Sequence, residues 1–509
     1  MKGIRRFFDN VIKVLPYLVV FIFSLYQPSD PDLGWHLKYG QYFWQNGKLL
    51  LNNTFSTMMP NYHWANTSWL TDIISYTAYH LGGLFGLTVL GALVVALTFY
   101  FFAKASRMSL WEQTIIFPIL LYLEMPVNSV SFRGQQLSLL LVGVLFYLIS
   151  LYEKRPKLLW LTILLFWIWV DIDGEFLLGY VLFVSWVGLY IAKKFVERVF
   201  IIDRKEEKLR KRFNLSLSKI KLVFFQEKKE IGILLAILVL SFLATMITPF
   251  GDRLLLSTFF YIGSPLLKDI EEYLPFQMYS LGWWNEIFVG VLIIFGLFIL
   301  FFRGKFLEKM PILGGGILLY VLSLQVLRYA WPAFYLLFPL LAMTASFLKP
   351  DGKKLTKNIS TMFLIIFFAA AVWSRYPFMQ YINFNWNGYC RIQVLPCSAE
   401  SAEFLINHHL NHDIFSLYGW GGWLIWNYPQ IKPTIDGRMH LWVQNGYSAF
   451  TDYYAIEQDM KDINTTSYDV AYISSDKPVY NRLMQLTEEK EWKLVYKDQA
   501  ASIFIRNKK

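Results

Sequence analysis

Long apolar runs that carry few charges recur along most of this chain, and they limit its fold more than any other feature. Of the 509 residues, 55% are hydrophobic and only 17% are charged, whereas a soluble globular protein has about 25% charged residues. A membrane-crossing helix needs roughly 20 apolar residues. The pattern therefore predicts a polytopic membrane protein, and it excludes soluble enzymes, disordered chains and collagen-like chains.

The apolar runs predict about eleven transmembrane helices. The first run follows a basic N-terminal segment, but no small-residue cleavage site comes after it, so we expect an uncleaved helix with a cytoplasmic N-terminus. The predicted spans are residues 14–26, 84–103, 112–126, 136–152, 158–172, 176–192, 231–249, 284–302, 311–327, 331–348 and 359–374.

The excess of basic residues has a membrane explanation. Lysine and arginine number 48 against 37 acidic residues, a net charge of +11. Such a charge in a soluble chain would indicate nucleic-acid binding, but here the basic residues gather in short connections between apolar runs. The positive-inside rule places those connections in the cytoplasm. We therefore expect no nucleic-acid partner, a plasma-membrane location and an extracytoplasmic C-terminus. Whether the basic loop 193–230 binds a cytoplasmic partner or anionic lipid stays open.

The ionisable residues on the predicted outer side are the functional candidates, since charge near membrane depth is costly. Ordinary loop charges are the alternative for each of them. The candidates are Asp30, Asp32, His36, Arg133, Asp171, Asp173, Glu175, Glu271, Glu272 and Arg328.

Residues 375–509 differ from the membrane body, 1–374, by their mixed polar and apolar composition. Turn signals separate a predicted helix at 399–410, capped by Ser398, from a second helix at 478–489 and strands at 470–473, 492–496 and 501–505. We expect a small extracytoplasmic α/β domain. Cys390 and Cys397 both fall in it, and an oxidising compartment favours a disulfide over two unpaired thiols.

The segment Asp30-Pro31-Asp32 begins the predicted outer loop, 27–83. One carboxylate can act as general base on an acceptor hydroxyl. The pair can instead hold a divalent metal such as Mg²⁺ or Mn²⁺. A solvated turn is the third interpretation. His36 is expected to contact phosphate or to orient a carboxylate.

Trp420, Trp423 and Trp426 recur at three-residue intervals. They predict either an aromatic seat on the membrane surface or a stacking platform for sugar rings. Asp436-Gly437-Arg438 is interpreted most simply as a turn with a local ion pair.

Several short motifs, taken in order, resemble the GT-C superfamily of membrane glycosyltransferases, and in particular the bacterial branch near the aminoarabinose- and mannosyl-transferase-like enzymes. Asp171 and Asp173 stand where that branch has asparagine and histidine. The matching motifs are Asp30-Pro31-Asp32, Trp35-His36-Leu37, Gly40, Asn53-Thr54-Phe55-Ser56, Trp64, Trp69-Leu70, Leu81-Gly82-Gly83, Arg133-Gly134-Gln135, residues 171–176, Thr248-Pro249-Phe250-Gly251, residues 270–273, Arg328-Tyr329, residues 418–424 and residues 435–438.

The resemblance implies an inverting transferase that takes a sugar from a polyprenyl-phosphate donor to a lipid, glycan or protein acceptor on the outer face. Asp32, or else Asp30, would be the base. Arg133 and Arg328, with His36, would hold the phosphate, because guanidinium binds phosphate through paired hydrogen bonds; structural pairing with Glu271, Glu272 or Asp173 is the alternative for each arginine. Candidate substrate contacts are Asp171, Asp173, Glu271, Glu272, Trp420 and Trp423.

Three rival functions stay open, and one of them is a non-catalytic member of the family that only binds a lipid-linked glycan. The acidic motif also resembles that of metal-dependent single-subunit oligosaccharyltransferases, although residues 416–426 lack the Trp-Trp-Asp motif of that family. A lipid or sugar transporter is the second rival, although the chain has no visible half-to-half repeat.

Overall fold

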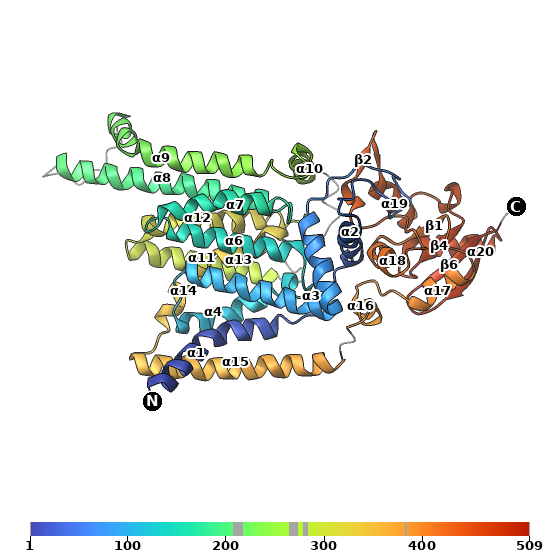
Figure 1. Cartoon of the computed structure of the whole chain (residues 1–509), viewed down its shortest axis with the longest axis horizontal. Coiled ribbons are helices and arrows are strands. Elements are labelled where there is room, and N and C mark those ends of the chain that lie inside the picture. Colours follow the sequence, from blue (N-terminus) through green and yellow to red (C-terminus); the bar gives the residue numbers. More distant parts are fainter. Residues whose placement is uncertain (1, 207–216, 264–272, 278–282, 382–383, 508–509) are drawn as a thin grey trace.

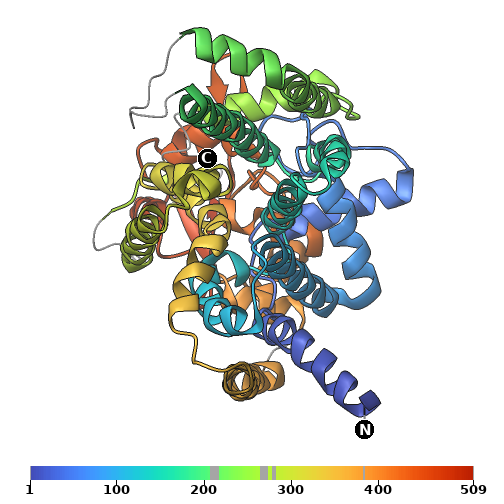
Figure 2. The same cartoon turned by 90° about the vertical axis from the view of Figure 1, so that its left-hand side faces the viewer.

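The protein consists of a helical bundle with a smaller α/β domain at one end (Figure 1). The structure is a computed structural model, and it describes residues 2–206, 217–263, 273–277, 283–381 and 384–507. Figure 2 views the bundle from the end that lies away from the C-terminal domain. The chain begins at that distant end and finishes in the domain.

The predicted apolar runs all lie on helices of the bundle. Helices suit a lipid environment because every backbone group is paired within the element. The helices of this region are α1 (Lys2–Phe23), α3 (Trp69–Ala105), α4 (Leu110–Leu123), α5 (Met125–Asn128), α6 (Gly134–Leu151), α7 (Leu161–Trp169), α8 (Phe176–Glu206), α9 (Leu217–Ala244), α10 (Asp252–Gly263), α11 (Trp283–Phe302), α12 (Phe306–Ser323), α13 (Ala330–Leu336), α14 (Phe338–Phe347) and α15 (Lys353–Tyr381).

The predicted number of spans is not confirmed. Among the described residues, six helices are long and apolar enough to cross a membrane, or seven if the bent pair α13 and α14 forms one span. Three other apolar helices are shorter, at Asn10–Phe23, Leu110–Leu123 and Pro156–Trp169. A helix of 14 residues such as α4 is about 21 Å long, against a hydrocarbon core of about 30 Å.

Helix α3 is broken at Gly82 and Gly83, and Gly83 adopts a positive φ of 59°. The segment before the break crosses the end of the bundle and packs against α2 (Leu33–Asn46). Gly40 allows this contact, because a Cβ there would overlap the backbone oxygen of Asp72. The break thus places Asp72 beside α2, at the boundary with the C-terminal domain.

The C-terminal domain confirms the predicted strands and the second predicted helix within one residue, whereas the helix predicted at 399–410 ends at Asn407. Its sheet has the order β1-β4-β6-β5, in which β1 and β4 are parallel and β6 is antiparallel to both β4 and β5. The elements are α16 (Trp386–Ile392), α17 (Ala399–Asn407), β1 (Ile414–Ser416), α18 (Gly421–Asn427), β2 (Val443–Gln444), β3 (Tyr447–Ser448), α19 (Ala449–Glu457), β4 (Val470–Ile473), α20 (Pro478–Glu488), β5 (Trp492–Lys497) and β6 (Ser502–Arg506).

The outer loop shares a hydrophobic core with the C-terminal domain. Leu33, Trp35 and Leu37 of α2 belong to the same buried cluster as Trp423 and Leu424 of α18. The helical bundle has a separate core around Phe102 and Tyr335. The loop therefore belongs to the domain by packing, although it follows the first helix in the chain.

Candidate functional site

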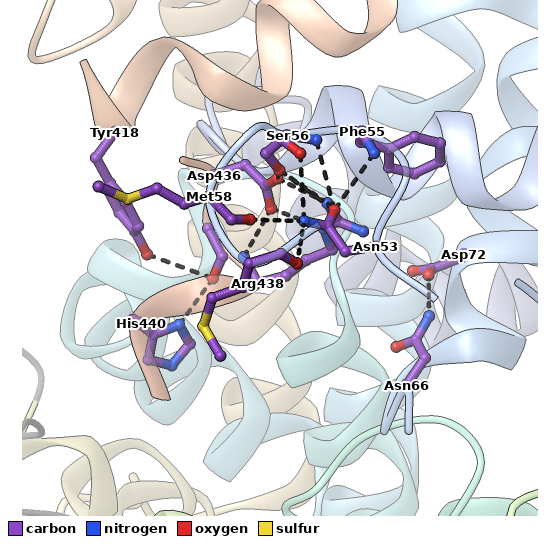
Figure 3. Close-up of polar contacts among 12 residues, drawn as sticks. Asn53, Phe55, Ser56, Met58, Asn66, Asp72, Tyr418, Asp436, Arg438 and His440 are labelled. Atoms are coloured by element: carbon purple, nitrogen blue, oxygen red, sulfur yellow. Dashed lines mark hydrogen bonds and ion pairs between the residues drawn. The ribbon is translucent and has the colours of Figure 1, made fainter. Parts of the chain in front are cut away.

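The outer loop and the C-terminal domain meet backbone to backbone. Thr57 N donates to Pro433 O at 2.9 Å, and Met58 N donates to Thr434 O at 3.0 Å. Helices α2 and α18 approach so closely that a Cβ on Gly34 would overlap the carbonyl of Gly422. Figure 3 shows Asn53 and Ser56 of the loop beside Asp436 and Arg438 of the domain.

Asp32 lies at this contact, immediately before α2, and its carboxylate does not cap the helix. It lies instead against the backbone of Gly437, where any Cβ would overlap both carboxylate oxygens. Burial, followed by the negative charge of Asp30, raises the pKa of Asp32 to about 7, although His36 acts in the opposite direction. A carboxylate with a pKa near neutrality is suited to accept a proton at physiological pH.

Asp30 shapes the loop that presents Asp32. Its Oδ1 accepts a hydrogen bond from Asp32 N at 3.0 Å. Its backbone oxygen accepts one from the Tyr389 hydroxyl of α16 at 2.6 Å. Both carboxylates of the predicted pair are therefore at the site, and Asp32 is the one that faces Gly437.

His36 pairs with Asp72, a residue that sequence analysis missed. His36 Nδ1 contacts Asp72 Oδ1, and Asn66 Nδ2 donates to the other oxygen at 2.6 Å. Burial lowers the pKa of His36, but Asp72, Asp30 and Asp32 together raise it above its ordinary value. The carboxylate that His36 contacts is therefore Asp72, which holds the ring at Nδ1. We call Asp32, His36, Asp72 and Gly437 the junction site.

A fully buried ion pair is formed by the two residues on either side of Gly437. Arg438 Nε and Nη2 each lie 2.7 Å from a carboxylate oxygen of Asp436, and Nη2 also donates to Asn53 Oδ1 at 3.0 Å (Figure 3). Ser56 bonds to the same carboxylate. The predicted local ion pair is thus confirmed. It is also the anchor that holds the outer loop, and we call these four residues the Asp436–Arg438 clasp.

Aromatic rings enclose the guanidinium of the clasp. Its carbon lies 4.8 Å from the ring centre of Phe55, 5.2 Å from Trp64 and 5.3 Å from Trp442. Cation–π attraction to these rings offsets part of the cost of burying the charge. Arg438 nevertheless lowers the pKa of Asp436 against the effect of burial, so the pair is ionised.

A second polar group contains Arg133 and Arg328, which both lie near Asp173 and Glu175. Arg328 Nε lies 2.8 Å from Glu175 Oε1. Burial is the largest effect on the carboxyl groups of Asp173 and Glu175, and it raises the pKa of Glu175 to about 7. The positive charges of Arg328 and Arg133 act in the opposite direction and lower the pKa of both carboxyl groups. We call Arg133, Asp173, Glu175 and Arg328 the arginine cluster. The acidic partner of Arg328 is Glu175, and the predicted alternatives did not include it.

His440 connects the two groups. Its Nδ1 lies 2.7 Å from the backbone oxygen of Gly437, which also accepts from the Tyr418 hydroxyl at 3.3 Å. Burial lowers the pKa of His440, and the charge of Arg328 lowers it further. The junction site and the arginine cluster are therefore within electrostatic range of each other.

Asp171 joins neither group. Its Oδ1 accepts from Trp69 Nε1 at 2.7 Å, and its backbone oxygen accepts from Leu70 N at 3.0 Å. These bonds fasten the start of α3 to the loop before α8, which is a structural role. The predicted contacts Glu271 and Glu272 lie outside the described residues.

Trp420 and Trp423 require a correction. Their exposed fractions are 1% and 2%, so neither ring is available to a sugar or to the membrane surface. Trp420 packs against Tyr472, and its Nε1 donates to Pro396 O at 3.1 Å. The three-residue interval reflects burial of α18 beneath the outer loop. An amphipathic pattern cannot distinguish this from a surface seat.

The predicted metal pair does not have a suitable set of ligands. Asp30 and Asp32 supply hard oxygen atoms, but Nδ1 of the nearest histidine, His36, faces Asp72. Across the described ranges, no three His, Cys, Asp or Glu residues are grouped so that they could hold an ion. No step is therefore assigned to a metal.

Cys390 and Cys397 form the expected disulfide. It closes the segment that joins α16 to α17, and α16 carries Tyr389, which bonds to Asp30. The cross-link therefore holds the side of the domain that supports the acidic loop.

The fold and site define a largely helical protein, with helices able to cross a membrane and a polar site where the loop after the first helix meets an α/β domain. No protein-family model matches the chain, and neither does any curated protein.

Proposed function

We propose that the chain is a GT-C-type integral membrane glycosyltransferase that moves a sugar from a polyprenyl-phosphate donor to an acceptor hydroxyl, with inversion. About eleven membrane passages, a cytoplasmic N-terminus and an extracytoplasmic C-terminal domain belong to this proposal. The observation that carries it is the Asp32 carboxylate, held against Gly437 with a pKa of about 7 at the end of an apolar helical bundle.

In the proposed reaction, Asp32 accepts the proton of the acceptor hydroxyl as its oxygen bonds to the anomeric carbon. The bond from that carbon to the phosphate oxygen breaks, and the polyprenyl phosphate leaves with the bonding electrons. A base with a pKa near the working pH is effective because it is largely ionised and still basic.

The arginine cluster supports the donor side of this reaction. Two guanidinium groups close to one another can neutralise a leaving phosphate through paired hydrogen bonds. Glu175 already accepts from Arg328, so the phosphate would share that arginine or displace the carboxylate. The acceptor can be a lipid, a glycan or a protein.

The test is transfer by the purified full chain in lipid, using radiolabelled polyprenyl-phosphate sugars. Asp32→Asn should reduce turnover by at least about 100-fold while donor binding persists. Asp459→Asn is the matched control, because Asp459 is exposed and lies in the C-terminal domain. Unchanged turnover in Asp32→Asn would contradict the assignment.

A second arm separates the rival functions. Turnover that survives a chelator agrees with the proposal. Turnover only with a diphosphate oligosaccharide and a divalent metal would replace it with oligosaccharyl transfer. Lipid movement across vesicles without transfer would indicate a transporter.

A further inference from the structure

A basic cavity lies at the opposite end of the bundle from the junction site. It has a volume of about 380 Å³ and is formed where α1, α4 and α15 meet. Helices α1 and α15 pack against each other there (Figure 1), and Figure 2 views the bundle from that end. Four lysines from two separate parts of the chain line the cavity, namely Lys13 of α1 and Lys349, Lys353 and Lys357 at the start of α15.

Two helices also begin at this cavity. Ser109, Leu110 and Trp111 open α4, and Lys353 opens α15. The N-terminus of a helix carries a partial positive charge and unpaired N–H groups. The α4 terminus is already capped by the Ser109 side chain and the Glu112 carboxylate. The α15 terminus, whose first turn has no acidic residue, and the four ammonium groups therefore favour negative charge here.

The described lining contains no acidic residue. Neither Glu112 nor Asp351 lines the cavity, and the Glu112 carboxylate accepts from Ser109 N at 2.5 Å. Within the described part of the chain, the ammonium groups of Lys13, Lys349 and Lys353 have no salt bridge. A topological charge excess alone would not require Lys13 and the lysines of residues 349–357, which are distant in the chain, to line one cavity.

The remaining walls are apolar, and so is the surface beside the cavity. Ile12, Leu110 and Trp111 contribute to the lining. Next to it, Val14 of α1 is 60% exposed and Leu355 of α15 is 52% exposed. In the membrane arrangement proposed above, exposed apolar side chains beside a basic cavity correspond to the boundary between acyl chains and lipid headgroups.

We propose that this cavity binds the phosphate of an anionic phospholipid headgroup. The lysines surround the phosphate, the N-terminus of α15 lies beside it, and the acyl chains follow the apolar faces of α1 and α15. The lipid has no part in the proposed transfer reaction, so the two proposals stand or fall separately.

The test is native mass spectrometry of the full chain in detergent, supplied with phosphatidylglycerol or with zwitterionic phosphatidylethanolamine. The cavity variant is Lys13→Gln, Lys353→Gln and Lys357→Gln combined. The control removes the same charge from exposed connections through Lys154→Gln, Lys157→Gln and Lys305→Gln. Thermal unfolding verifies that all three proteins are folded.

The wild type and the control should retain phosphatidylglycerol in preference to phosphatidylethanolamine. The cavity variant should lose that retention by about tenfold or more. Inorganic phosphate is added as a competitor: persistence of the lipid assigns the cavity to a headgroup, and displacement assigns it to free phosphate. Equal losses in both variants, or no preference for the anionic lipid in the wild type, would overturn the proposal.

Discussion

The carboxylate of Asp32 lies against the backbone of Gly437, so close that no side chain fits between them. Asp32 comes from the loop after the first helix, and Gly437 comes from the C-terminal domain. The base proposed for transfer is thus positioned by a segment remote in the chain. Its geometry depends on how firmly the loop and the domain are joined.

Gly437→Ala is the most direct test of that contact. A Cβ would overlap both oxygens of Asp32, so the carboxylate must move, and a displacement of about 1 Å reduces turnover by about 100-fold. Gly419→Ala is the control in the same domain, because its Cβ would meet only Leu395 at an ordinary 3.9 Å. Transfer assays on both variants measure the effect. Equal activity would show that the Asp32–Gly437 contact has no role in turnover.

The pKa of Asp32 predicts how turnover and stability depend on pH. Turnover should rise as pH increases through about 7, because the base must be ionised. Stability should change in the opposite direction. A carboxyl with a raised folded-state pKa contributes stability below its unfolded pKa of about 3.9 and loses it as pH rises through about 7.

Asp32→Asn separates these effects. At pH 8 the variant should be more stable than the wild type by about 1–4 kcal/mol, and at pH 4 the two should be nearly equal. Urea unfolding at both pH values measures the difference. A variant less stable than the wild type at pH 8 would contradict the raised pKa.

The sequence predicted the elements well but not the contacts between them. Apolar periodicity and turn signals were enough for β4, β5, β6 and α20, because those signals are local. The number of spans was harder to predict, because the length of an apolar run such as α4 does not show whether its helix crosses a membrane or packs inside the bundle. The sequence likewise did not predict the 50° bend between α13 and α14, which divides one predicted apolar run into two helices.

In the candidate site, too, individual residues could be predicted from the sequence but their contacts could not. Asp32 and His36 stood out because they fall in a short motif after an apolar run. Asp72 had one signal, an ionisable residue at the start of a long apolar helix. Its pairing with His36, like that of Asn53 with Arg438, joins distant segments, which a single sequence does not reveal.

Removal of one charge of the Asp436–Arg438 clasp should lower the free energy of unfolding strongly, whereas replacement of both residues by apolar ones should lower it only slightly. Both side chains are 0% exposed, so Asp436→Asn leaves a buried guanidinium unpaired, at a cost of about 3–5 kcal/mol. The double variant Asp436→Leu with Arg438→Met removes both charges and should recover most of that loss. Chemical unfolding measures all three proteins.

The exposed pair of Asp452 and Lys461 is the control for the clasp. The distance between its charged atoms is 2.6 Å, yet the lysine side chain is 42% exposed, so Asp452→Asn should cost less than about 1 kcal/mol. Equal effects of Asp436→Asn and Asp452→Asn would contradict the anchoring role of the clasp.

Removal of the disulfide should loosen the support of the acidic loop. Cys390 and Cys397 are 7 residues apart, and a loop of that length stabilises a fold by about 2 kcal/mol through the entropy of the unfolded chain. Cys390→Ser with Cys397→Ser should therefore lower the unfolding free energy by about that amount, and a reductant should have the same effect on the wild type alone.

Tyr389→Phe removes the hydroxyl that bonds to Asp30 and should cost about 1 kcal/mol. If α16 supports the loop as inferred, Tyr389→Phe should cost less in the disulfide-free protein than in the wild type, because that contact is already weakened. Full additivity of the two losses would show that the disulfide and the tyrosine act independently.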